Sequence, residues 1–194
     1  MRYRSLLLAL PLFTGAMLYG QPAPRATIHG KPVYEQEVYP VVENSLSRMW
    51  HSADAVVEVK IESTEVKAVG RTPLVRAFHT SRVLRVLKGD MKKDCSLIFS
   101  EAAGQLELAD RVLRGGNGDP LPAGERYILF LSRSEPAGTW ALQGQRAGAF
   151  RLREGRVQPQ GFGAVADEQR NLRERQFSDE LERLAGHNRP KSLG

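Results

Sequence analysis

Cysteine is nearly absent from this chain of 194 residues, in which Cys95 is the only one. A single thiol cannot form an internal disulfide, so the fold has to be held by a hydrophobic core. Cys95 begins the apolar run 95–99. That position indicates a buried and unreactive thiol, because a nucleophile would need a partner base and an electropositive setting. A disulfide between two chains remains open for a lone cysteine.

Histidine is also scarce, and no metal-binding pattern surrounds the four that occur. Neither H-x-x-x-H, H-E-x-x-H nor C-x-x-C is present, and the acidic residues lack the alternating spacing of a calcium loop. Asn117 to Asp119 has the composition of a turn rather than of a cation site. His29 and His187 fall in the expected flexible ends. We therefore expect no metal and no cofactor.

The two remaining histidines give no catalytic constellation. His51, Ser52 and Asp54 are adjacent in sequence, whereas a catalytic triad brings together residues from separate segments. We assign these three residues to a helix end and a turn. His79 lies on a predicted strand, so we expect it in the wall of the fold rather than as a general base.

Motifs for nucleophilic or phosphate chemistry are missing as well. No G-x-S-x-G elbow occurs. Gly115, Gly116 and Gly118 are followed by the segment Asp119–Pro122, whose prolines prevent the helix start that a phosphate-binding loop requires. We interpret these glycines as a structural loop and assign no catalytic residue. The sequence predicts a protein that is not an enzyme.

The charge balance argues against a basic surface for nucleic acid. The whole chain has a formal charge of +6, and removal of residues 1–20, with Arg2 and Arg4, would leave 26 bases against 22 acids. Bases and acids are interleaved, and no basic run alternates with aromatic residues. This mild excess supports solubility and loose association with anionic polymers, so we expect no specific nucleic-acid partner.

The most informative feature that is present lies at the N-terminus. Arg2 and Arg4 precede the apolar stretch 6–18, which ends in small residues. This pattern is typical of a cleaved secretory signal peptide over residues 1–20, because the run is too short to span a bilayer comfortably. Gln21 stands where a lipoprotein would need cysteine. A retained anchor is the alternative, but we predict a secreted or periplasmic chain with no stable membrane anchor after cleavage.

Composition divides the rest of the chain into three parts. Residues 21–39 are polar and rich in proline, as in a flexible linker. Residues 40–160 hold short apolar runs separated by turn residues, which indicates a β-barrel domain with a leading helix. Residues 161–194 form a charged extension with a short helix. The hydrophobic content of 41% is enough for one core.

Periodicity identifies individual elements within the barrel domain. Apolar residues at helical spacing predict a short helix over 41–52. Val57, Val59 and Ile61 alternate with charged residues, as in a strand with one solvated face. The run Tyr127–Leu131 is continuously apolar, which is typical of a central strand covered on both faces.

Two segments of the barrel domain are less regular. The apolar parity changes along 74–87, so we expect a β-bulge near Arg82 to Arg85 that lets the sheet bend. The segment Leu106–Leu113 fits either a strand or a single helical turn, and the pattern does not choose between them.

The C-terminal extension carries one helical pattern. Phe177, Leu181 and Leu184 form an apolar stripe. Ser178 is the expected N-cap, and Gly186 is the expected C-cap. We therefore predict a short helix that packs on the barrel.

Two segments together resemble a known family. In Val83–Asp90 a strand ends in Lys-Gly, and in Leu121–Leu131 a Gly-Glu-x-Tyr turn enters an apolar strand. Both resemble the netrin-like module, which includes the N-terminal domain of tissue inhibitors of metalloproteinases, and uncharacterised bacterial exported proteins with the same barrel. The resemblance implies an OB-like Greek-key barrel over roughly Ala53 to Val157. The N-terminal cysteine that binds zinc in those inhibitors, and their disulfides, have no counterpart here, so only the fold carries over.

The expected fold is therefore mainly β, a small closed OB-like barrel with a short N-terminal helix and a C-terminal helix. The expected function is an exported binding or accessory module without enzymatic activity, whose partner is a protein or an envelope polysaccharide. A protease-inhibitor-like effector and an unrecognised hydrolase that uses His79 are the alternatives. The sequence identifies no binding residues.

Overall fold

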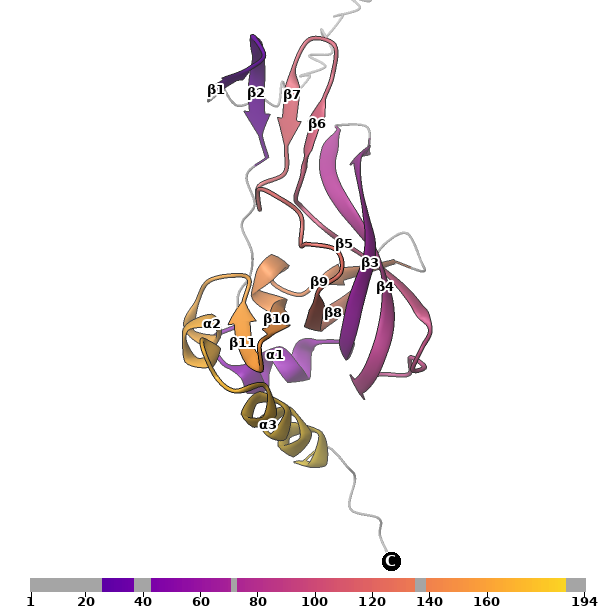
Figure 1. Ribbon diagram of the computed structural model, residues 1–194, viewed down its shortest axis with the longest axis vertical. Helices are drawn as coiled ribbons and strands as arrows, with labels where there is room; N and C mark the ends of the chain where they lie inside the picture. The colour runs from indigo at the N-terminus through magenta and orange to yellow at the C-terminus, as the bar shows by residue number, and fades with distance from the viewer. Residues whose placement is uncertain (1–25, 37–42, 71–72, 135–138, 188–194) are drawn as a thin grey trace, which may run out of the picture.

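The fold is mainly β, as the sequence predicts (Figure 1). The computed structural model describes residues 26–36, 43–70, 73–134 and 139–187, so the expected signal peptide over 1–20 lies outside the described residues. In chain order the elements are β1 (Ala26–Ile28), β2 (Lys31–Glu35), α1 (Leu46–Ser52), β3 (Ala55–Val69), β4 (Leu74–Lys88), β5 (Ser96–Glu101), β6 (Gln105–Glu107), β7 (Val112–Arg114), β8 (Arg126–Ser134), β9 (Thr139–Leu142), the 3₁₀ helix η1 (Gln145–Gly148), β10 (Ala149–Arg153), β11 (Arg156–Pro159), α2 (Ala164–Gln169) and α3 (Glu174–His187).

The larger sheet has the strand order β11-β10-β8-β3-β4-β5-β9. Because β8 also pairs with β9, the strands β8, β3, β4, β5 and β9 form a ring of pairings, to which β10 and β11 are added at β8. Strand β9 runs parallel to β5 and antiparallel to β8. Within the ring each strand is therefore paired on both edges along at least part of its length.

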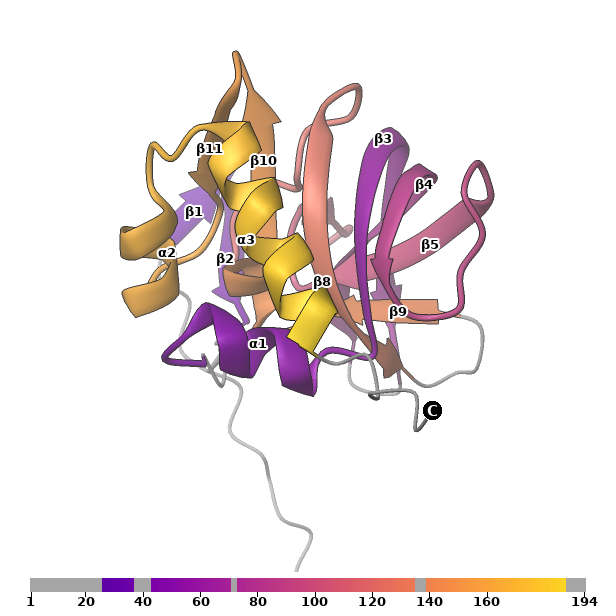
Figure 2. The same cartoon turned by 90° about the horizontal axis from the view of Figure 1, so that it is seen from below.

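Two apolar cores lie on opposite faces of this sheet. The inner core fills the ring and includes Val57 and Leu129. The outer core includes Val56 and Ile128 and lies under α1 and α3, which Figure 2 shows on the same side of β8. Since β8 is covered on both faces, every residue of Tyr127–Leu131 is buried, which confirms the prediction from its continuous apolar run.

The helix predicted over 41–52 is present as α1 but begins only at Leu46, because residues 43–45 are described and are not helical. The hydroxyl of Ser45 caps it by accepting a hydrogen bond from the Arg48 backbone N–H at 3.2 Å. At the other end, the Lys88 ammonium donates to three backbone oxygens, those of Trp50, His51 and Ala53. The end of β4 is thereby joined to the carbonyls that the helix leaves without partners.

The predicted β-bulge is confirmed. Glu58 pairs with Arg85, and the next residue, Val59, pairs with Val83, so Leu84 has no partner on β3. The extra residue moves the following side chains to the other face, which is why the apolar parity of the sequence changes there.

Strands β3 and β4 are 15 residues each, longer than the ring requires. Their ladder continues to the pair Val69–Leu74, whereas β8 accompanies β3 only to Lys60 and β5 accompanies β4 only from Ala77 onward. The remainder projects as an arm, beside which the small sheet β1-β2-β7-β6 lies (Figure 1). On its inner face the arm buries Val75.

The small sheet corrects one prediction and decides another. Residues 26–35, which we expected within a flexible linker, contain β1 and β2. Strand β2 pairs in parallel with β7, and its Val33 is buried, so tertiary pairing overrides the polar composition. The segment Leu106–Leu113 contains parts of β6 and β7, which pair as antiparallel strands and not as a helical turn.

The C-terminal extension holds more helix than predicted. Helix α3 begins at Glu174, so Ser178 lies inside it and does not cap it, and Gly186 also lies inside the helix. The predicted apolar stripe is correct, because Phe177, Leu181 and Leu184 are all buried. Helix α2 was not predicted, since its six residues are too few for a clear apolar period.

Candidate functional site

One part of the sheet keeps apolar side chains accessible. Along β4, alternate residues point into the ring and the arm and are buried, while the others face outward. We define the β4–β5 face by the outward residues Leu74, Arg76, Phe78, Thr80 and Arg82 of β4 and Ile98 of β5. The side chains of Leu74 and Ile98 are two of the three exposed large hydrophobics in the described residues, at 41% and 44% exposure.

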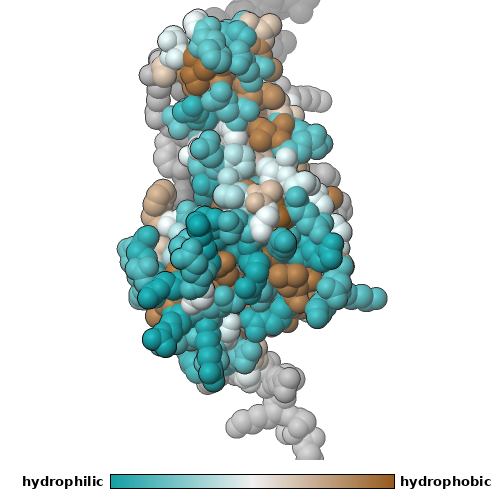
Figure 3. Space-filling view, viewed as in Figure 1, coloured by the Kyte–Doolittle hydropathy of each residue, from teal (hydrophilic) through white to brown (hydrophobic). Residues whose placement is uncertain are grey.

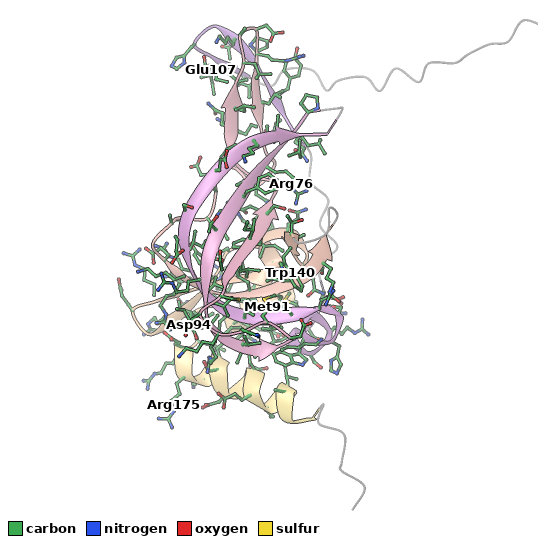
Figure 4. All side chains as sticks on the ribbon, turned by 90° about the vertical axis from the view of Figure 1, so that its right-hand side faces the viewer. Arg76, Met91, Asp94, Glu107, Trp140 and Arg175 are labelled. Atoms are coloured by element: carbon green, nitrogen blue, oxygen red, sulfur yellow. The ribbon has the colours of Figure 1, made fainter. Side chains whose placement is uncertain are left out.

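The helices lie away from this face. Figure 4 shows Arg76 beside the upper part of the sheet, with α3 and its Arg175 at the opposite end of the molecule. The outer core that α1 and α3 cover includes Val56 and Ile128, which belong to the other end of the sheet. The β4–β5 face is therefore the part of the outer sheet surface that the described helices leave open.

Charged groups lie among and beside the apolar side chains of the β4–β5 face. The Arg76 guanidinium donates to the Ser100 hydroxyl at 2.9 Å. Burial lowers the pKa of Arg76, and the negative charge of Glu101 opposes that shift. The ammonium of Lys67 lies 5.9 Å from the centre of the Phe78 ring. Aromatic and arginine side chains, both present on this face, are enriched in protein-binding surfaces.

A second cluster of functional groups is buried at the end of the ring where the arm begins. His79 and Glu101 are both completely buried, and His79 Nε2 donates to Glu101 Oε1 at 3.0 Å. The other ring nitrogen, Nδ1, lies 2.9 Å from the hydroxyl of Thr64. Strand periodicity predicted His79 in the wall of the fold, and this is confirmed, but neither partner was predicted.

The carboxylate of Glu101 gathers further donors. Its Oε1 also accepts from the backbone N–H of Leu121 at 2.8 Å, and its Oε2 accepts from Arg146 Nε at 2.7 Å. Burial alone would raise the pKa of Glu101, but the hydrogen bonds from His79 and Arg146 outweigh it and hold that pKa below its ordinary value. The ionised carboxylate thus joins β4, β5, η1 and the loop before β8.

This cluster has the residue types of a nucleophile, a base and an acid, but it is sealed. The His79 ring is stacked on Phe99 with 4.6 Å between ring centres, and no part of it is exposed. The acid is also bound by Arg146, which neutralises the charge that would assist a base. The arrangement is suited to holding elements together rather than to attack on a substrate.

A third polar site lies beside α3. Glu58, expected on a solvated face, is only 8% exposed and corrects that expectation. Arg126 donates to it at 2.6 Å and to Glu174 of α3 at 2.7 Å, while Arg85 donates to Ser178 at 3.0 Å. Glu58, Arg85, Glu174 and Ser178 line a groove of about 750 Å³, on a side of the molecule whose surface is largely hydrophilic (Figure 3). The groove walls are already paired with one another, which explains how α3 is held in place.

The residues tested for a catalytic triad at the end of α1 face different partners. His51 Nδ1 donates to the backbone oxygen of Ser47, and Asp54 accepts from the backbone N–H of Arg133. The hydroxyl of Ser52 donates to the backbone oxygen of Arg48. They are helix-end and turn residues, as predicted.

The other residues considered from the sequence are also structural. His29 stands in the β1–β2 turn rather than in a flexible end. His187 is the last residue of α3. Cys95 is partly buried against the inner core. In the described residues, no group of three or more His, Cys, Asp or Glu side chains is arranged to hold a metal ion.

The glycine-rich loop is bound to the segment after β5. Gly115 donates to the backbone oxygen of Gly104, and Gly104 donates to that of Gly118. A Cβ on Gly115 would lie 2.6 Å from the backbone nitrogen of Ala103, so this position requires glycine because of the close approach of two chain segments. The loop is structural, in agreement with the sequence.

The motifs that carry the family resemblance have structural roles. Lys88 binds the end of α1, and Gly89 has φ +101° where the chain leaves β4. Glu125 accepts a hydrogen bond from Arg151, and its backbone oxygen accepts from Ile61. Tyr127 is fully buried, and burial raises its pKa to about 12. Both motifs therefore join strands and a helix, and neither forms a surface for a ligand.

Comparison with known proteins gives no further guide. No protein-family model matches the chain, and no curated protein matches it either. Among the described helices, none is both long enough and apolar enough to cross a membrane.

Proposed function

We infer that the ring of strands is a closed OB-like barrel of the kind found in the netrin-like module. The order of strands in the ring supports this inference. In chain order the ring strands are β3, β4, β5, β8 and β9, and the first three are neighbours in the ring. The fifth, β9, lies between the third, β5, and the fourth, β8. The parallel pairing of β5 with β9 also agrees with that topology. The resemblance of the Lys-Gly and Gly-Glu-x-Tyr segments points in the same direction.

We propose that the protein is an exported binding module without enzymatic activity, secreted or periplasmic after removal of residues 1–20, and that it docks a protein partner on the β4–β5 face. The observation that carries the proposal is that one uncovered sheet face exposes Leu74 and Ile98, with the half-buried Phe78 between their positions along β4. Apolar side chains gathered on an uncovered sheet face mark interaction sites more often than scattered ones do. In OB-like folds the second and third strands, here β4 and β5, supply a common binding face.

A protein partner is favoured over an envelope polysaccharide. Sugar rings are commonly held on exposed aromatic side chains, and Phe162 is the only aromatic among the exposed large hydrophobics of the described residues. Phe162 lies between β11 and α2, far from the β4–β5 face in sequence and in the sheet order. The two exposed residues on the face are aliphatic, which suits a protein surface.

Affinity capture with the processed chain tests the proposal. From a periplasmic extract, the wild-type chain and Phe162→Asp should capture the same protein, while Ile98→Asp should capture about tenfold less because a charge replaces an exposed apolar side chain of the face. Equal capture by all three chains would remove the β4–β5 face as the site. Titration with soluble envelope polysaccharide, with a heat signal that Ile98→Asp abolishes, would replace the protein by a sugar polymer.

The hydrolase alternative has one observation in its favour, the hydrogen bonds that join Thr64, His79 and Glu101. It predicts that a panel of ester and peptide substrates is turned over and that Thr64→Val abolishes turnover. Thr64→Val keeps the side-chain shape and leaves the His79–Glu101 contact in place. Turnover that Thr64→Val does not change would exclude this cluster. The inhibitor-like alternative has no support from the described residues, since the cysteine that those inhibitors use has no counterpart.

A further inference from the structure

Among the described residues, no strand is hydrogen-bonded to one edge of the arm, although β6 of the small sheet packs near β3. Strand β8 pairs with β3 as far as Lys60. The backbone of Ile61 then forms hydrogen bonds with Gly124 and Glu125 in the turn before β8. From Ser63 to Val69, β3 pairs with β4 on one side only among the described residues. The backbone N–H and C=O groups that alternate along the other side are a template for a further strand.

This open edge is regular and has defined ends. A bulge between Ile61 and Ser63 interrupts the ladder at one end, and β3 itself ends at Val69. The seven residues between these points contain no proline, which would remove a backbone donor, and no glycine, which would weaken a strand. Their two charged residues, Glu65 and Lys67, would discourage pairing with a strand that lacks complementary charges. The edge can therefore accept a strand with complementary charges over its full length.

The sequence of the edge is complementary to itself. In an antiparallel pair about a two-fold axis, the register that uses all of 63–69 places Val66 against Val66 of the second copy. The same register places Glu65 against Lys67 of the second copy, and it does so twice. A shift of the axis by one residue would place either Glu65 against Glu65 or Lys67 against Lys67, which is unfavourable.

The charged side chains of this edge are available. Glu65 and Lys67 are 66% and 50% exposed, and their charged groups lie 2.7 Å apart within one chain. Because this ion pair is exposed, it contributes little, and each side chain can instead contact the opposite charge on a second copy. Both are paired in register with outward residues of β4, Glu65 with Phe78 and Lys67 with Arg76. The contact would therefore continue the outer surface of the sheet.

We propose that two copies of this chain associate through the edge 63–69 of β3, as an antiparallel strand pair centred on Val66. The two-fold axis stands perpendicular to the sheet, so the β4–β5 faces of the two copies lie on the same side of one continuous sheet. The dimer is weak, because a single strand pair is smaller than a standard interface. It does not depend on the function proposed above.

Sedimentation velocity of the processed chain at increasing concentration tests this dimer. The wild-type chain should dimerise reversibly. Glu65→Lys and Lys67→Glu should each weaken the dimer by about tenfold, because each places like charges opposite one another twice. The double variant Glu65→Lys/Lys67→Glu restores the opposite charges and should restore the dimer. Lys92→Glu, an exposed reversal in the β4–β5 loop, is the matched control and should dimerise as wild type does.

Three outcomes would overturn the proposal. A chain that stays monomeric up to about 1 mM has no such contact. A dimer that neither single reversal weakens uses another surface. Failure of the double variant to recover, while its circular dichroism and melting match the wild type, would show that the two charges do not face one another across the axis. Binding of a foreign extended peptide to the edge of a monomeric chain would assign the edge to a different partner.

Discussion

At the scale of single residues, Glu101 concentrates more contacts than any position that the sequence singled out. One carboxylate accepts hydrogen bonds from His79, Arg146 and the backbone of Leu121. A buried charge is costly unless such partners surround it, and removal of one member leaves the others unpaired. The stability of the junction between ring and arm therefore depends on this one side chain.

Replacement of Glu101 by glutamine should lower the free energy of unfolding by about 3 kcal/mol, because the partly buried Arg146 guanidinium loses its fully buried counter-charge while the side-chain shape is kept. Urea unfolding at pH 7 measures the change. Glu107→Gln removes a carboxylate of the exposed contact with Lys31 and is the matched control, which should unfold almost as wild type does. Equal losses in the two variants would contradict the role of burial.

The same residue predicts a response to acid. Because hydrogen bonds hold the pKa of Glu101 below its ordinary value, its ionised form stabilises the fold above the unfolded-state pKa of about 4.3. That contribution is lost as the pH falls through the lower pKa of the folded state. The wild-type free energy of unfolding should therefore fall more steeply than that of Glu101→Gln when the solution is acidified below about pH 4.

The partners of this cluster show what sequence periodicity can and cannot predict. Alternation along β4 placed His79 on the buried side of a strand. It could not name Glu101, which stands on the next strand, or Arg146, which stands in a 3₁₀ turn after β9. Which residues meet across strands depends on register and on the closure of the ring, and neither is recorded in a local pattern.

At the scale of elements, α3 shows how a helix is fixed by two different means. Its apolar stripe enters the outer core, where the rings of Phe177 and Phe150 lie 5.0 Å apart. Its first turns are held by an ion pair between Arg126 and Glu174 and by a hydrogen bond from Arg85 to the Ser178 hydroxyl. The apolar contacts supply most of the stabilisation, because partly exposed ion pairs contribute little.

Replacement of Phe177 by alanine should therefore lower the free energy of unfolding by about 3–5 kcal/mol and loosen α3. Hydrogen exchange should show faster exchange throughout Glu174–His187, while the ring strands keep their protection. Arg175→Ala, an exposed position in the same helix, is the control and should change neither quantity appreciably. Unchanged protection of the helix in Phe177→Ala would show that the polar contacts suffice.

The elements predicted correctly are those with a long, unbroken period. The alternation of β3, the apolar run of β8, the bulge at Leu84 and the stripe of α3 all follow from side-chain patterns. The small sheet was missed because β1, β6 and β7 have three residues each, too few for a period, and because Pro32 occurs within β2. The start of α3 was predicted too late in the chain because serine is a common N-cap residue. In the structure the Ser178 hydroxyl accepts a hydrogen bond from Arg85 instead.

At the scale of the whole molecule, the described residues contain two cores, one filling the ring and one beneath the helices. Neither needs a disulfide, and Cys95 is free. These two cores supply the apolar burial that the prediction requires of a fold without an internal disulfide. The proposed export signal also concerns the whole molecule, because its removal determines which residues the mature chain contains.

Intact-mass measurement of the chain recovered from the envelope or medium should show loss of residues 1–20. With Gln21 at the new N-terminus, part of the material should be lighter by one ammonia, since an N-terminal glutamine cyclises. Expression without export, in the cytoplasm, supplies the control, which should keep its full mass. A recovered chain that retains residues 1–16 would show that no signal peptidase acts there.

The position of β9 has a consequence for the order of events during biosynthesis. This strand joins β5 to β8, yet Thr139–Leu142 follows every other member of the ring in the chain. A polypeptide that emerges N-terminus first must hold four strands in an incomplete assembly until the fifth arrives. Pairings between distant segments form slowly, so the nascent chain should stay open, and susceptible to proteases and chaperones, until nearly three quarters of it has been made.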